Sequence, residues 1–594
     1  MGMRAIATNT PGATHADNQR TKRRNGNNDL RLLPVAITIW AATLATQLAG
    51  AQSSANGSNT HSNMLLACCG GCTVMALLAI MYLTHAHPHP QGAAMRMPAI
   101  ACTLTVICFA ALAGTFTTLA WQYRTASDIA SRLTANASST QSHVNFQARS
   151  MPVASTTREY DCQVDALTIS VESSGLLEPS HIGMRVFMRN EACSTIMQNG
   201  TYRAQGRIRT ARYGREPVWL ETSMAVETVS EPSMFWRALH SMRTAFFTQT
   251  SRLDDQGSIL VPGVTLGVLG QNIVTPAGQT QVEEQYAQQL QDRCKRAGIM
   301  HLMAVSGGHY TLVHKLVMLL CAALGCSRPV KTVALAGAYL CLTAMLPPNE
   351  SVTRANLMAM IALGYLMLGR RRQSIHLLSL TAIVALLFDP SLAASIGFAL
   401  SCSAVLGLSL MCRPLSQRLE QHLPATLARA ISASICAQAF AMPIQLLMSN
   451  EIPIYSLPAN LLVAPFVDIA TMLGLGALLL AWCAPSIAYA LAWASSACTR
   501  AIAVAADTFG AGDSSTLPWM EGATGIIMLV IAQLTFYAIC MGIRAWVNAY
   551  DAWRTGADGK QIRASITQRV IGWFSQTLAM IGDITWASQH RSKR

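Results

Sequence analysis

Charged side chains are scarce in this sequence of 594 residues. Asp, Glu, Lys and Arg together make up 12% of it, whereas hydrophobic residues make up 51%. Soluble domains carry about 25% charged residues, so an ordinary soluble protein of this length would lack the charge to cover its surface. The scarcity of charge excludes a typical soluble enzyme. It indicates several transmembrane helices, each of roughly 20 apolar residues.

Motifs that would supply energy or hold a metal are also missing. No G-x-x-x-x-G-K-[ST] phosphate loop occurs, which argues against ATP hydrolysis by this chain. His85, His87 and His89 alternate, but no Asp-His follows them, so we expect no metal site and no cofactor. The formal charge of +14 is not by itself evidence for a nucleic-acid partner, because cytoplasmic loops of membrane proteins are rich in Lys and Arg.

Apolar runs at about 33–51, 64–84 and 98–121 follow a basic N-terminus (1–32). They predict three N-terminal spans within 33–121. Basic loops stay in the cytoplasm, so the N-terminus is expected inside and the segment after residue 121 outside. Nothing in residues 1–32 requires a cleavable signal peptide.

A second block of spans is predicted between residues 299 and 543, followed by a basic, amphipathic, cytoplasmic tail at 544–594. The loop charges obey the positive-inside rule, except for Arg500 inside a span. The expected fold is a polytopic α-helical membrane protein with about 12 membrane segments, some of them re-entrant. The nine predicted segments of this block are 299–325, 330–346, 353–369, 374–388, 391–412, 426–449, 455–482, 486–508 and 522–543.

The segment 122–255 contains no spanning run. Residues 122–157 are predicted to be a linker, and from about 158 short alternating stretches predict strands at 167–171, 184–188, 202–208 and 218–220. We expect a small extracytoplasmic β-barrel. Its two cysteines, Cys162 and Cys193, are a candidate disulfide. In the next region, 256–298, the charged stretch 282–298 predicts an amphipathic surface helix.

Basic and aromatic residues are interleaved in this β-domain. In the stretch Tyr202–Arg209, alternation places the arginines on one face of a strand. Such a surface suits a single nucleic-acid strand, although a solvated strand face would have the same pattern. The candidate DNA-binding residues are Arg203, Arg207, Arg209, Arg212, Tyr213, Arg215 and Trp219.

The most informative stretch is HLMAVSGGH, which begins at His301 and ends at His309. Polar groups at membrane depth are costly, so they usually face a cavity or a partner. Interhelical hydrogen bonding is one interpretation, and proton relay by the two histidines in a small-molecule transporter is another. Ser306 and His309 would share a helix face in a hydrolase, but no third orienting carboxylate and no nucleophile elbow are evident.

This stretch resembles the core motif of the ComEC family of competence proteins, and further motifs of that family follow in order over about 260–480. They are Leu266–Gly270, Ser351–Ala359, Gly369–Arg372, Phe388–Pro390, Ser395–Ser401 and Asn460–Pro465. The resemblance implies a channel that takes up single-stranded DNA, with an OB-fold as the β-domain. It also implies candidate channel-lining residues, namely His301, Ser306, Gly307, Gly308, His309, Arg354, Asn356, Ser395, Gly397, Ser401, Gln438 and Asn460.

The same resemblance implies partners. An extracytoplasmic DNA receptor and a cytoplasmic DNA helicase or translocase would act with the channel in the lipid membrane. Many members of the family carry a C-terminal metallo-β-lactamase-like domain with an H-x-H-x-D-H motif, and this sequence has no such motif. We therefore expect a nuclease supplied by another protein, and no catalytic residues here.

Overall fold

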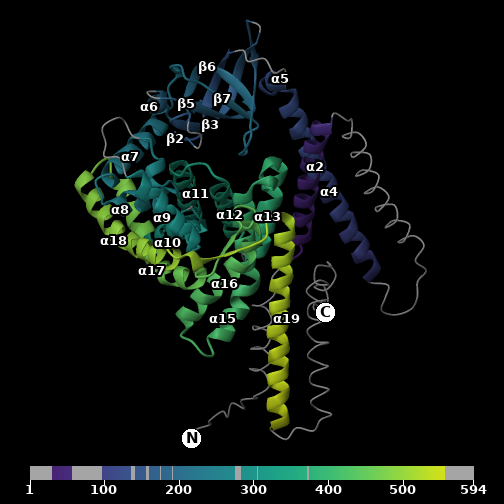
Figure 1. The fold of residues 1–594 in the computed structure, drawn as a ribbon. Helices are drawn as coiled ribbons and strands as arrows, with labels where there is room; N and C mark the ends of the chain where they lie inside the picture. Colours follow the sequence, from purple (N-terminus) through teal and green to yellow (C-terminus); the bar gives the residue numbers. More distant parts are fainter. Residues whose placement is uncertain are drawn as a thin grey trace, which may run out of the picture.

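The computed structural model describes residues 30–56, 96–135, 141–155, 159–173, 175–189, 192–274, 283–303, 305–370 and 373–554. The predicted span 64–84, the histidine run and the tail beyond residue 554 lie outside the described residues. A β-domain lies at one end of the molecule, above a larger helical part (Figure 1).

Five strands of the β-domain close into a ring. They pair in the order β1-β3-β5-β7-β6, and β6 pairs again with β1. The pairs are antiparallel except for β5 with β7, which is parallel. The elements are β1 (Gln141–Ala148), β2 (Val153–Ala154), β3 (Cys162–Ser173), β4 (Leu176–Pro179), β5 (Gly183–Met188), α6 (Ala192–Thr195), β6 (Thr201–Thr210), β7 (Val218–Glu221) and β8 (Glu227–Ser230).

The inward-facing side chains of these strands form the core of the domain. Val144, Phe146, Val186 and Leu220 are fully buried, and polar residues alternate with them. All four predicted strands are confirmed, each lying within an observed strand. The predicted linker 122–157 was wrong at its end, because β1 already begins at Gln141. Half of β1 is polar and outward-facing, so its composition resembles that of a loop.

Seven of the described helices are long and apolar enough to cross a membrane, and the shorter α13 is also apolar. The helices are α2 (Leu33–Asn56), α4 (Arg96–Ser127), α5 (Ile129–Ala135), α7 (Met234–Thr250), α8 (Asp255–Leu266), α9 (Glu284–Arg296), α10 (Gly307–Ala323), α11 (Arg328–Met345), α12 (Glu350–Met367), α13 (Ser374–Phe388), α14 (Ile396–Gly407), α15 (Arg413–Leu419), α16 (Ala425–Gln445), α17 (Ser456–Leu480), α18 (Pro485–Gly510) and α19 (Gly522–Arg554). Short segments η1 (Gly270–Asn272), η2 (Met300–Met303), η3 (Pro390–Ala394), η4 (Leu408–Cys412) and η5 (Asp513–Ser515), and a ribbon of β9 (Glu451–Pro453) with β10 (Thr516–Pro518), connect them.

Two helices, α7 and α8, were not anticipated from the sequence. The apolar side chains of α8 are buried against α17 and α18. Asp254 caps the start of α8 by accepting a hydrogen bond from the Gly257 amide, and it also accepts one from Arg500 at 2.9 Å. This ion pair accounts for the position of Arg500, the one charge that the topology prediction left unexplained.

Candidate functional site

The alternation predicted for β6 is confirmed by burial. Tyr202 and Ala204 face the core, whereas Arg203, Arg207 and Arg209 are exposed on the outer face. Two more arginines, Arg212 and Arg215, follow in the loop between β6 and β7 and are also exposed. We call these five residues the arginine face.

Carboxylates already neutralise two members of the arginine face. Arg209 pairs with Glu221 at 2.9 Å, and Arg215 pairs with Asp389 of the helical part. Arg203 donates to the amide oxygen of Asn145, which carries no charge. In the described part of the chain, Arg203, Arg207 and Arg212 are therefore the members with no acidic partner.

Trp219 was predicted to lie on the binding surface, but its side chain is buried. It is 6% exposed, and its ring packs edge-on against Phe187 and Tyr213, with centroids 5.1 Å and 4.6 Å away. Tyr213 is 46% exposed and covers it. Tyr213 is therefore the aromatic ring of this pair that is accessible at the surface, whereas Trp219 belongs to the packing beneath it.

The loop between β6 and β7 also carries a half-buried carboxylate, Glu216. Burial raises its pKa, and the neighbouring Asp165 raises it further, while Arg215, Arg149 and Arg185 act in the opposite direction. The Glu216 carboxylate fills the space beside Gly183, since a Cβ atom there would lie 1.5 Å from its Oε2. Ionised Glu216 is thus held in an unfavourable environment.

We expect Glu216→Gln to raise the melting temperature of the detergent-solubilised protein at neutral pH. A pKa raised in the folded state means that stability is full below the unfolded-state pKa and falls as pH rises through the folded-state value. The gain should therefore disappear below about pH 4, where Glu216 is protonated in both states. Glu159→Gln, at an exposed carboxylate, is the control. Equal gains at both pH values would contradict the assignment.

A junction between the β-domain and the helical part is built around Asp389 and η3. Besides its ion pair with Asp389, Arg215 donates from Nε to the Ser391 hydroxyl at 3.0 Å. From α2, Trp40 donates to the Ala393 carbonyl at 3.0 Å and Gln47 to the Pro390 carbonyl at 2.7 Å. The Phe388–Pro390 motif therefore lies where the β-domain, α2 and η3 meet.

The central motif divides into two helical segments at its glycines. Residues Met300–Met303 form η2, and α10 begins at Gly307 with Ser306 as its N-cap, accepting from the Gly308 amide at 3.2 Å. His309 is buried, and its Nε2 lies 3.0 Å from the Val264 carbonyl at the end of α8. The ring thus satisfies a helix-terminal carbonyl. Ser306 and His309 are each engaged with backbone groups, and burial separates the ring of His309 from the exposed Ser306.

Arg354 lies where three of the motifs meet. It projects from α12, is 5% exposed, and donates from Nε and Nη2 to the Ser401 hydroxyl of α14 at 2.9 Å and 2.6 Å. One turn earlier, the Glu350 carboxylate faces Gly397, where a Cβ atom would lie 3.1 Å from Oε2. Glu350 and Arg354, four residues apart on α12, therefore face Gly397 and Ser401, which are four residues apart on α14. Glu350 is not among the site residues predicted from the sequence.

The other candidate channel-lining residues are spread over η2, α12, α14, α16 and α17. Asn460 at the start of α17 donates to the Ser456 carbonyl at 2.7 Å and lies 3.5 Å from the Gly298 carbonyl, which His301 also approaches. Gln438 donates to Gln445 on α16 at 3.3 Å. Asn356 is half-buried on α12, and Ser395 caps α14. The candidate channel-lining residues therefore form several separate clusters in the structure.

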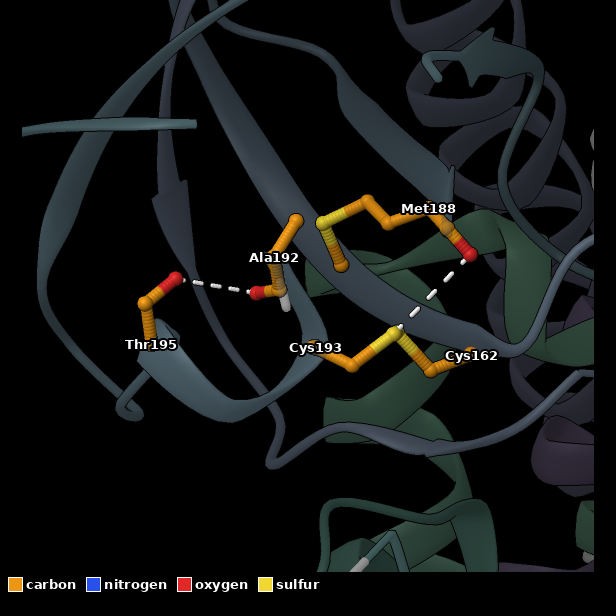
Figure 2. The surroundings of a disulfide bond; sticks show 5 residues. All are labelled: Cys162, Met188, Ala192, Cys193 and Thr195. Atoms are coloured by element: carbon orange, nitrogen blue, oxygen red, sulfur yellow. Dashed lines mark hydrogen bonds between the residues drawn. A yellow bond between two sulfur atoms is a disulfide. The ribbon is translucent and has the colours of Figure 1, made fainter. Parts of the chain in front are cut away.

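Figure 2 shows the bond between Cys162 and Cys193. It joins the start of β3 to α6, 31 residues apart in sequence. The Cys193 sulfur lies 3.9 Å from the Met188 carbonyl oxygen, and Thr195 donates to the Ala192 carbonyl at 3.0 Å. Both cysteines are buried, so the bond belongs to the core of the β-domain.

A β-domain joined to a block of long apolar helices defines a multi-pass membrane protein with a separate folded domain. Residues 282–544 match the family model described as Competence protein. A curated relative, ComE operon protein 3 of Bacillus subtilis (strain 168), is 28% identical over 251 residues, which is 42% of this chain and 30% of that relative. Over residues 282–544 the chain is therefore similar to competence proteins, in agreement with the ComEC-like motifs of its sequence. No solved structure matches it significantly.

Proposed function

We propose that this protein passes single-stranded DNA across a cytoplasmic membrane during natural transformation. The observation that carries the proposal is the competence-family match over residues 282–544, which covers most of the long apolar helices. The arrangement beside it is consistent with this function, because the arginine face lies on the domain that the Asp389 junction attaches to these helices. The chain matches less than a third of the length of its curated relative, so the activity of the whole relative enters here as part of the proposal.

We further propose that the β-domain is an OB-like barrel. Its strand order, the closure of β6 on β1 and the position of α6 before β6 support this interpretation. OB-folds bind oligonucleotides along a strand face and the adjoining loops. The loop between β6 and β7 would then carry Arg212 and Tyr213 toward the DNA, next to the junction made by Arg215.

The proposal includes an orientation and partners. The N- and C-termini are cytoplasmic and the β-domain is extracytoplasmic, as the basic loops predict. About 12 segments lie in the membrane. A receptor delivers DNA outside, a helicase or translocase draws the strand inside, and a separate nuclease degrades its complement. The protein itself acts as a channel and performs no chemical step.

The test is genetic. The gene would be introduced into a naturally competent host that lacks its own channel gene, and transformation by a marked chromosomal fragment would be measured. Restored transformation with unchanged growth supports the proposal. Correct insertion of the protein into the membrane without any transformation, in a host whose other uptake proteins are intact, would contradict it.

We expect the triple substitution Arg203→Ala, Arg207→Ala and Arg212→Ala to weaken binding of single-stranded DNA to the full-length protein. Each phosphate contact with a single strand contributes about 0.7 to the slope of log affinity against log salt, so the slope should fall by roughly 2. Arg209→Ala is the matched control, because Arg209 is already paired with Glu221. Equal slopes in the triple variant and the parent would mean that the arginine face does not bind DNA and is an ordinary solvated strand surface.

A further inference from the structure

The first turn of α10 faces the buried guanidinium of Arg354. A Cβ atom placed on Gly307 would lie 3.7 Å from Nη1 of Arg354 and 3.9 Å from Nη2. On Gly308, a Cβ atom would meet the Ser306 hydroxyl at 3.1 Å and no other atom within 4 Å. The two glycines thus leave the backbone at the start of this 17-residue helix without side-chain cover.

Arg354 has no anionic partner in the described part of the chain. Nε and Nη2 both donate to Ser401, a neutral hydroxyl, and Nη1, which faces Gly307, donates to no group there. Glu350, one turn away, is not within ion-pair distance. Burying a guanidinium without an opposite charge is costly, and in a membrane protein such a group usually marks a site for a ligand or ion.

The start of a helix carries a partial positive charge and free N–H groups, so it attracts anions. Here that positive end lies beside the guanidinium of an arginine that is only 5% exposed. We propose that Gly307, Gly308 and Arg354 form a binding site for a phosphate oxyanion. Given the proposed function, the anion is a phosphodiester of the passing DNA strand.

A single guanidinium matches the single negative charge of one phosphodiester group. It donates a charge-assisted hydrogen bond from Nη1, while Ser401 fixes the orientation of the guanidinium plane. Because only one cation is present, the strand can leave as readily as it arrives, which conduction requires. The site therefore holds successive phosphates in passing.

The experiment uses the full-length protein in nanodiscs of neutral lipid, with inorganic phosphate and oligothymidine as probes. Both should raise the melting temperature of the parent, whereas an oligothymidine with an uncharged methylphosphonate backbone should not. In Arg354→Gln the apparent affinity for phosphate should fall by roughly tenfold or more, as expected for loss of a charge-assisted hydrogen bond. The matched control is Arg243→Gln, at another buried arginine, on α7, which should keep the parent's affinity.

Two further variants keep the test decisive if Arg354→Gln does not fold. Gly307→Leu has room for its Cβ atom and covers the guanidinium, so it should lose the response to phosphate, whereas Arg354→Lys should retain part of it. Unchanged phosphate affinity in Gly307→Leu and in a folded Arg354→Gln would overturn the site. Stabilisation by anionic lipid and by phosphate, but not by oligothymidine, would overturn the assignment to DNA in favour of a lipid headgroup.

Failure of this inference is distinguishable from failure of the proposed function. Normal transformation by Arg354→Gln, with its phosphate response lost, would overturn the DNA assignment while leaving the channel function intact. Absence of transformation by the parent would contradict the channel function, and the assignment to DNA that rests on it. The phosphate measurements would still decide whether the anion site exists.

Discussion

Replacement of Gly308 by leucine is expected to abolish DNA uptake in the complemented competent host while the protein still folds and reaches the membrane. Gly308 is exposed in the first turn of α10, and a Cβ atom there would meet the Ser306 hydroxyl, which can rotate away. The leucine side chain would then add bulk at the exposed start of α10, next to Gly307, which faces Arg354. Its bulk would obstruct a passing strand without disturbing the core.

Ser306→Ala is the matched comparison, because it changes the same turn by removing atoms. Ser306 caps α10, and losing such a cap costs about 1 kcal/mol of stability. Much of the uptake should therefore remain. Membrane levels are checked by immunoblot and uptake by transformation frequency. If Ser306→Ala alone destroyed uptake at normal membrane levels, the result would favour the hydrolase interpretation. The proposal that this motif lines the channel and acts without catalysis would then be wrong.

Removal of the disulfide is expected to lower the stability of the β-domain by roughly 3–4 kcal/mol, the loop-closure entropy for residues 31 apart in sequence. The variant is Cys162→Ala with Cys193→Ala, since alanine leaves no buried hydroxyl. The small domain depends on this bond because β3 and α6 are otherwise held by one modest core. Chemical denaturation followed by Tyr and Trp fluorescence measures the loss.

Cys341→Ala, at an exposed free cysteine in α11, is the control and should leave stability unchanged. Reductant should lower the stability of the parent but not of the double variant. Thiol labelling of the purified, unreduced protein provides a direct check. Reaction of both Cys162 and Cys193 without reductant would contradict the pairing, or the extracytoplasmic position of the domain.

Periodicity and composition sufficed for much of the fold. The alternation in Tyr202–Arg209 identified both the strand and its exposed arginines, because side chains of a strand point alternately to opposite faces. The apolar runs located the long helices, since a span needs an uninterrupted apolar length. These features are local, so the order of residues along the chain was enough to determine them.

Tertiary structure decided which of these residues act together. The sequence could not show that Asp389 pairs with Arg215, 174 residues away, or that Trp219 lies beneath Tyr213. It could not separate the buried His309, which binds the end of α8, from the exposed Ser306 beside it. Nor could it place Arg354 opposite Gly307. Ion pairs, burial and the convergence of helix ends depend on which elements pack together, and packing is a property of the whole chain.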